Sequence, residues 1–74
     1  MDKAQRERVM RRLGARIRQL RKARKMSQEA VALSAGIDRS YFGAIERGEK
    51  NVSLVNIERI AAALQVGAGE LFGE

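Results

Sequence analysis

The sequence predicts an all-α fold, with five helices in one compact domain that spans residues 1–74. The chain has 74 residues, which suits one domain near the lower limit of what folds alone. It contains no proline and is rich in Ala, Leu, Ile, Glu, Lys and Arg, all of which favour helices or tolerate them well. Apolar residues also recur at helical spacing between residues that start and end helices.

The first helix is expected from about Ala4 to Lys25, with residues 1–5 frayed. Its apolar residues are spaced four, four and three apart, which is one stripe of a helix. The stripe consists of Val9, Leu13, Ile17 and Leu20. A solvated face is the simplest interpretation of most arginines on this helix.

Two short helices follow, at 28–35 and 39–47, with a tight bend between them. Ser27 and Asp38 are suitable N-caps, because their side-chain oxygens can accept from unpaired backbone N–H groups. Gly36 and Gly48 are placed to end the two helices in the left-handed conformation. The residues expected to face inward are Val31, Ala35, Ile37, Phe42 and Ile45. Ala32 lies in the middle of its helix, where a small side chain lets the next helix approach closely. The outer face of the second helix is then Arg39, Ser40, Tyr41, Gly43, Ala44 and Arg47.

The C-terminal region, at about 54–72, predicts two more helices for the core and for dimerisation. Ser53 caps a helix from Leu54 to about Leu64, with an inward stripe of Leu54, Ile57, Ile60, Ala61 and Leu64. One short last helix is expected in 66–72, where Gly67 has no capping side chain and must rely on packing. An apolar residue precedes three of the N-caps and can pack five positions later, as a hydrophobic staple. These pairs are Met26 with Val31, Ile37 with Phe42, and Val52 with Ile57.

Charge is distributed unevenly along the chain. Residues 1–25 hold eleven basic and two acidic residues, a net charge of +9. Residues 26–74 hold four basic and seven acidic residues, a net charge of −3. The overall charge of +6 therefore comes from the first helix, and it predicts salt-dependent attraction to polyanions.

Composition excludes several classes of function. The chain has no Cys and no His, so the commonest general base and the usual thiolate or imidazole metal ligands are missing. We therefore expect no enzyme activity, no cofactor, no metal and no small-molecule partner. No segment has the length and apolarity of a membrane span or a signal peptide, which predicts a cytoplasmic protein. A membrane-surface or protein-interaction module using the first helix is a remote alternative, since that helix has only a narrow apolar face.

The segment from Gln28 to Gly48 resembles the helix-turn-helix of the lambda-repressor-like family, also called the Cro/repressor or XRE family. The matching residues are Gln28, Val31, Ala32, Gly36, Ile37, Phe42 and Ile45. The amino-acid sequence from Asp38 to Leu54 is similar to that of the controller proteins of restriction–modification systems. The resemblance covers roughly residues 10–72 and implies a sequence-specific, DNA-binding transcriptional regulator. A phage-type repressor and an antitoxin-like autoregulator remain alternatives.

The second short helix would then be the recognition helix, lying in the major groove of double-stranded DNA. Arg39 can bind guanine O6 and N7 together, and Ser40 can donate to a base or a phosphate. Tyr41 could meet a thymine methyl group or a phosphate, or instead pack on the first turn of a neighbouring helix. Gly43, beside the phosphates, and Ala44, beside the bases, would serve by being small, so that the helix can approach closely.

Further contacts are implied around the recognition helix. The resemblance implies that Gln28, next to Ser27, holds a phosphate and braces the start of the recognition helix; the alternative is an exposed residue with no partner. The expected phosphate contacts are Ser27, Gln28, Gly43, Arg47, Lys50 and Asn51. Asn51 could instead stabilise its own loop. Glu49 could repel phosphate or contact a neighbouring bound dimer.

The resemblance also implies a partly buried ion pair between Arg21 and Glu46, which would fix the first helix against the recognition helix. A homodimer is expected through Val55, Val66, Leu71 and Phe72, although Leu71 also suits the core and Phe72 could cover its own domain. Two recognition helices would read half-sites about 34–36 Å apart in a pseudo-palindromic operator. The bound protein would block RNA polymerase or contact it.

Overall fold

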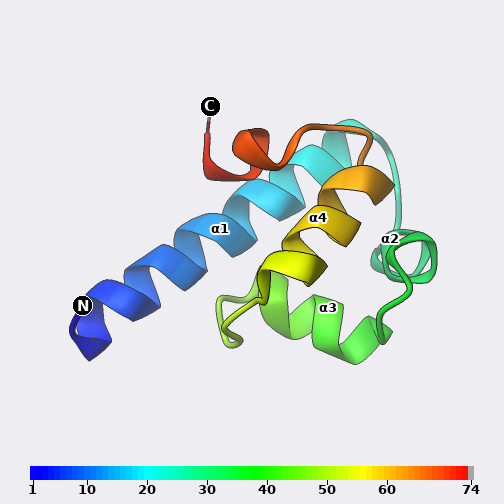
Figure 1. Cartoon of the computed structure of the whole chain (residues 1–74). Helices are drawn as coiled ribbons and strands as arrows, with labels where there is room; N and C mark the ends of the chain where they lie inside the picture. Colours follow the sequence, from blue (N-terminus) through cyan, green and yellow to red (C-terminus); the bar gives the residue numbers. More distant parts are fainter. Residues whose placement is uncertain (74) are drawn as a thin grey trace.

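The computed structural model describes residues 1–73, and this part of the chain is helical with no strand. It contains α1 (Lys3–Ala23), α2 (Gln28–Ala35), α3 (Arg39–Glu46) and α4 (Leu54–Ala63), followed by the 3-10 helix η1 (Ala68–Phe72) (Figure 1). The all-α prediction is confirmed, although the last element is a 3-10 helix. None of the described helices is both long enough and apolar enough to cross a membrane.

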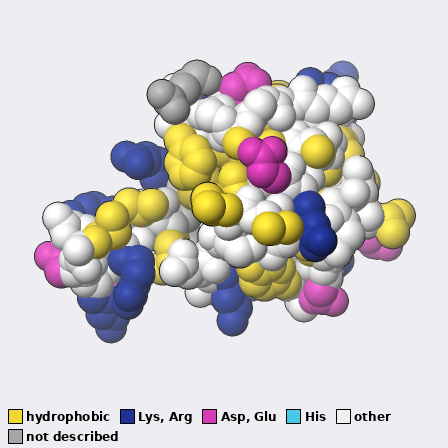
Figure 2. Space-filling model, viewed as in Figure 1, with side chains coloured by type: hydrophobic (Ala, Val, Ile, Leu, Met, Phe, Trp, Pro, Cys, Tyr) yellow, Lys and Arg dark blue, Asp and Glu magenta, His cyan; other side chains and the backbone are white. Residues whose placement is uncertain are grey.

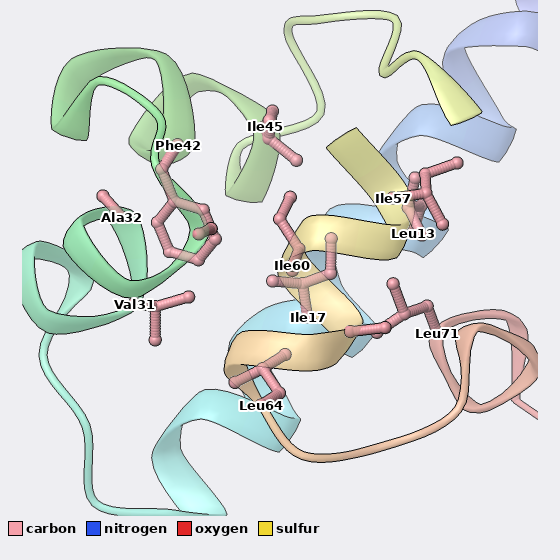
Figure 3. Close-up of a cluster of buried hydrophobic side chains, with 12 residues drawn as sticks. Leu13, Ile17, Val31, Ala32, Phe42, Ile45, Ile57, Ile60, Leu64 and Leu71 are labelled. Atoms are coloured by element: carbon pink, nitrogen blue, oxygen red, sulfur yellow. The ribbon is translucent and has the colours of Figure 1, made fainter. Parts of the chain in front are cut away.

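Every helix contributes to one hydrophobic core. α1 packs on α3 and η1, while α2 packs on α3 and α4, and η1 also lies against α4. Figure 3 shows the buried side chains meeting between these helices. The largest of those fully buried are Ile17, Val31, Phe42, Ile45, Ile60, Leu64 and Leu71. α3 is therefore held on its inner side by α1 and α2, which leaves its opposite side for contact with a partner.

The start of α1 differs from the expected frayed end. The Asp2 carboxylate accepts from the Gln5 backbone N–H at 2.8 Å, and the Gln5 side chain accepts from the Asp2 N–H at 2.9 Å. This reciprocal capping box satisfies two N–H groups that would otherwise lack partners. The helix therefore begins at Lys3, and its first turns project beyond the rest of the molecule (Figure 1).

The predicted N-caps of the next three helices are confirmed. Ser27 accepts from Ala30 N–H at 3.0 Å, and Ser53 accepts from Asn56 N–H at 3.1 Å. Asp38 accepts from the backbone N–H groups of Ser40 and Tyr41 in the first turn of α3. The residues preceding these caps are half-buried against the core, as expected for hydrophobic staples; they are Met26, Ile37 and Val52.

Two expectations for the C-terminal region are wrong. Leu54 is 81% exposed rather than inward, because it starts α4 one turn before the residues that reach the core. Packing is also not the only support for η1. The Glu70 side chain accepts from Gly67 N–H at 3.2 Å, and the Arg16 Nε donates to the Glu70 carbonyl at 2.8 Å.

Candidate nucleic-acid interface

An ion pair joins α1 to the C-terminal end of α3. Arg21 Nε donates to Glu46 Oε2 at 2.6 Å, and Arg21 Nη2 donates to Glu46 Oε1 at 3.1 Å. The two side chains are 12% and 3% exposed, and the hydrogen bond to Glu46 raises the pKa of Arg21 above its ordinary value. Arg21 Nη1 also donates to the Met26 carbonyl at 3.0 Å, so the guanidinium holds the chain entering α2 as well. This is the pair that the family resemblance implied.

Gln28 connects α2 to the same carboxylate. Its Nε2 donates to Glu46 Oε1 at 3.0 Å, so Glu46 receives hydrogen bonds from both α1 and α2. The expectation that Gln28 braces the start of the recognition helix is wrong, because its partner is the last residue of α3. Gln28 is half-buried and has a partner, which excludes the alternative of a free polar side chain.

Two glycines let the backbone of α1 pack directly against the backbone of α3 and of the loop after it. A Cβ at Gly14 would lie 2.3 Å from the Ile45 carbonyl oxygen and 2.6 Å from that of Glu46. A Cβ at Gly48 would lie 2.8 Å from the Arg11 Cα. Sequence reasoning missed Gly14, yet a lone glycine inside a helical pattern is itself a signal of close packing.

The exposed start of α3 carries Arg39 and Ser40. The Ser40 hydroxyl donates to the Asp38 carboxylate, which also accepts from the Ser40 and Tyr41 N–H groups. The Ser40 hydroxyl and these N–H groups hold the pKa of Asp38 below its ordinary value. Asp38 therefore stays ionised at the helix N-terminus, where a negative charge is favourable.

Tyr41 is half-buried beside the start of α4. Its ring packs against the core, and its hydroxyl accepts from Asn56 Nδ2 at 3.5 Å. This is the alternative in which Tyr41 packs on the first turn of a neighbouring helix. Its position between α3 and α4 leaves part of the side chain exposed beside Ser40.

Ala44 and Gly43 are not on the outer face, so the expectation for both is wrong. Ala44 is 6% exposed, and its carbonyl accepts from Glu49 N–H at 2.9 Å where the chain after α3 turns back. A Cβ on Gly43 would lie 3.2 Å from Arg47 Nη1 and 3.5 Å from Gln28 Oε1. Neighbouring side chains and the returning loop therefore cover the middle of α3.

Arg47 and Glu49 form an exposed pair after α3. Arg47 Nε and Nη2 donate to the Glu49 carboxylate at 3.1 and 3.2 Å. These hydrogen bonds lower the pKa of Glu49 and raise that of Arg47. Glu49 thus offsets the charge of Arg47 locally, while Lys50 and Asn51 remain exposed in the same loop.

The predicted dimer residues separate into two groups. Leu71 is fully buried, so its expected place in a dimer surface is wrong, because η1 inserts its side chain between α1 and α4. Val66 is half-buried against the core. Val55 and Phe72 are 60% and 44% exposed, and both stay available to a partner.

The pattern of the helix-turn-helix domain family matches residues 12–72. This match includes α2, α3 and nearly all of the core described above. The chain belongs to the XRE-like helix-turn-helix family. The family resemblance inferred from the sequence is therefore confirmed.

Several relatives of this helix-turn-helix protein are restriction–modification control proteins. Control protein C.MunI from Mycoplasma sp is 44% identical over 64 residues, which are 85% of this chain and 86% of that protein. Control protein C.BamHI from Bacillus amyloliquefaciens is 46% identical over 59 residues, covering 78% and 73% of the two chains. The restriction–modification controller protein C.AhdI from Aeromonas hydrophila is 51% identical in sequence, and its crystal structure matches this one with a TM-score of 0.84. That likeness covers 85% of this chain and 96% of C.AhdI.

In this helix-turn-helix protein, Glu46 at the end of α3 is hydrogen-bonded to both α1 and α2. These contacts hold α3, and with it the exposed start of the helix, in a fixed position. The chemistry at that end is hydrogen bonding, from Arg39 and Ser40. Cationic and amide groups lie at the other end of α3, where Gln28 is bonded to Glu46 and where Arg47, Lys50 and Asn51 follow in the chain. Such a set suits a polyanion that also carries hydrogen-bonding base edges.

Proposed function

We propose that this protein is a sequence-specific transcriptional regulator that binds double-stranded DNA. Its operator would be pseudo-palindromic and bound by a homodimer, and its targets would be restriction–modification genes. The observation that carries this proposal is the exposed start of α3, held in place by the buried Arg21–Glu46 pair at its other end. A recognition helix needs this combination, because base contacts depend on a fixed orientation in the major groove.

The base contacts in this proposal come from Arg39 and Ser40, with the exposed part of Tyr41 beside them. Arg39 has no hydrogen bond to the protein among residues 1–73, so its guanidinium is available to a guanine edge. The phosphate contacts come from Ser27, Gln28, Arg47, Lys50 and Asn51. Gln28 is only partly buried while bonded to Glu46, so the same hydrogen bond would orient it toward the backbone of the duplex.

The dimer surface in this proposal is the outer face of α4 with Phe72. That face carries the exposed Leu54 and Val55, and a shallow groove on it is lined by Leu54, Val55, Glu58, Arg59 and Ala62. Opposite charges stand next to each other at Glu58 and Arg59. In a two-fold arrangement each copy's Glu58 would meet the other copy's Arg59, as a self-complementary interface requires.

The regulated genes are proposed from the similarity to control proteins. A dimer bound at a promoter would block RNA polymerase or contact it, according to where the operator lies. The direct experiment uses the DNA immediately upstream of the gene for this protein and of any neighbouring nuclease gene, fused to a reporter. We expect protein-dependent change in transcription and specific binding to that DNA. Unchanged transcription from both fragments, together with no binding, would contradict the proposal.

A further inference from the structure

The first turns of α1 form a helical, basic extension that lies almost entirely outside the family match. We name residues 3–12 the N-terminal arm. The family match begins at residue 12, whereas the helix begins at Lys3 under the Asp2–Gln5 capping box. Figure 1 shows this arm projecting past the other helices. Because it is helical rather than frayed, its side chains have fixed directions relative to α3.

Five of the ten arm residues are basic, and they are Lys3, Arg6, Arg8, Arg11 and Arg12. The single acidic residue within the arm, Glu7, pairs with Lys3 at 4.0 Å and with Arg11 at 3.9 Å, and five basic residues against one leave the arm a net charge of +4. Figure 2 shows Lys and Arg side chains at both the lower and the upper edge of the projecting helix, with apolar side chains between them. The lower side is also the side on which α3 lies (Figure 1).

The arm starts beside the loop that carries Lys50 and Asn51. The Arg11 Cα lies so close to Gly48 that a Cβ there would be 2.8 Å away. From Arg11 to Lys3 a helix rises about 12 Å, at about 1.5 Å per residue. Phosphates on one DNA strand are spaced about 3.4 Å apart, so the arm spans three or four of them.

We propose that the N-terminal arm binds backbone phosphates of the same duplex, beyond those reached by the loop at 48–51. The inference rests on the proposed function and extends it to a second, sequence-independent contact surface. Arg8 and Arg12 lie one turn apart on the same face of α1. Their side chains have no hydrogen bond or ion pair among residues 1–73, so their charges are free for phosphate. Each neutralised phosphate releases condensed counterions and steepens the dependence of affinity on salt.

A lipid surface fits the arm less well than DNA. An interfacial helix needs a broad apolar face with bulky residues such as Trp or Phe. The arm contains neither, and its apolar residues Val9 and Met10 are already half-buried. Charge with only a small apolar surface beside it favours an electrostatic partner.

The test compares R8Q/R12Q with R18Q/K22Q, each a pair one turn apart on α1, in full-length protein bound to its operator duplex. All four positions are exposed on α1, and both variants lower the net charge from +6 to +4, so long-range attraction falls equally. Gln keeps helix propensity close to that of Arg. We expect R8Q/R12Q to lower the slope of log Kd against log salt by about 1.8 per protomer, at about 0.9 per phosphate contact. R18Q/K22Q should change the slope much less.

Phosphate-ethylation interference gives a second readout on the same complexes. The wild type should show sensitive phosphates three or four nucleotides from those assigned to Lys50, and R8Q/R12Q should lose only these. Equal slopes and equal interference patterns for the two variants would overturn the arm contact while leaving the proposed function intact. Failure of every one of these proteins to bind any operator would overturn both.

Discussion

Glu46, the last residue of α3, accepts hydrogen bonds from Arg21 on α1 at 2.6 and 3.1 Å. The same carboxylate accepts from Gln28 on α2 at 3.0 Å. One buried anion therefore fixes three helices to one another. The orientation of Arg39, at the opposite end of α3, depends on this connection.

The first prediction concerns the charge of Glu46. Glu46→Gln keeps the shape of the side chain but leaves the Arg21 guanidinium without its counter-ion in a site that is 12% exposed. Removing one partner of a buried pair costs about 3 kcal/mol or more in free energy of unfolding. In a domain of this size that lowers Tm by more than about 10 °C, measured by circular dichroism. Glu49→Gln removes an exposed pair with Arg47 and is the matched control, with little expected change. Equal melting curves for the two variants would show that the buried pair does not support the fold.

The second prediction concerns the close approach of α1 to α3. The Cβ of Gly14→Ala would meet backbone carbonyls at 2.3 and 2.6 Å, and backbone cannot move aside as a flexible side chain can. Overpacking of this kind costs about 1–3 kcal/mol. That cost opposes the gain of about 0.5–1 kcal/mol that Ala gives over Gly inside a helix. Gly67→Ala, which has open space around it, is the control. Chemical denaturation should rank Gly14→Ala clearly below both the wild type and the control; a stabilised Gly14→Ala would contradict the packing described.

The third prediction concerns the surface of α4. Val55→Asp places a charge in the centre of the proposed dimer face at a residue that is 60% exposed, so the monomer should still fold. Sedimentation should shift from dimer toward monomer. Leu33→Asp introduces the same charge on an exposed site of α2 and should leave the dimer unchanged. An unchanged dimer with Val55→Asp would place the interface elsewhere.

The fourth prediction concerns base recognition by Arg39. Arg39→Ala should weaken specific binding by about 1–3 kcal/mol and relax the preference at one base position in each half-site. Arg47→Ala, by contrast, should weaken binding to all sequences alike, as the loss of a phosphate contact does. Competition binding against single-base operator variants separates the two patterns. A uniform loss with Arg39→Ala would make Arg39 a phosphate contact instead.

Much of the fold follows from the sequence because its determinants are local. Ser27, Asp38 and Ser53 cap helices within three residues of themselves, and the apolar stripes follow from helical spacing alone. The start of α1 was missed although it is also local, since Asp2 and Gln5 form a capping box that the sequence contains.

The candidate site was less predictable, because its burial depends on contacts between distant segments. Ala44 is covered where the chain from Glu49 returns, and Leu71 is drawn inward by η1 packing on α1 and α4. Helical periodicity places a residue on a face but does not say what covers that face. The Arg21–Glu46 pair, 25 residues apart in sequence, was expected only through the family resemblance.

The central claim is that two copies of α3 read one DNA sequence. Selection from a random-sequence duplex pool, at about physiological salt to suppress non-specific phosphate binding, tests it most directly. The account predicts a single palindromic consensus whose half-sites lie about 34–36 Å, one helical turn, apart. Recovery of no consensus, with binding that disappears as salt rises, would contradict it and assign the affinity to the charge of α1 alone.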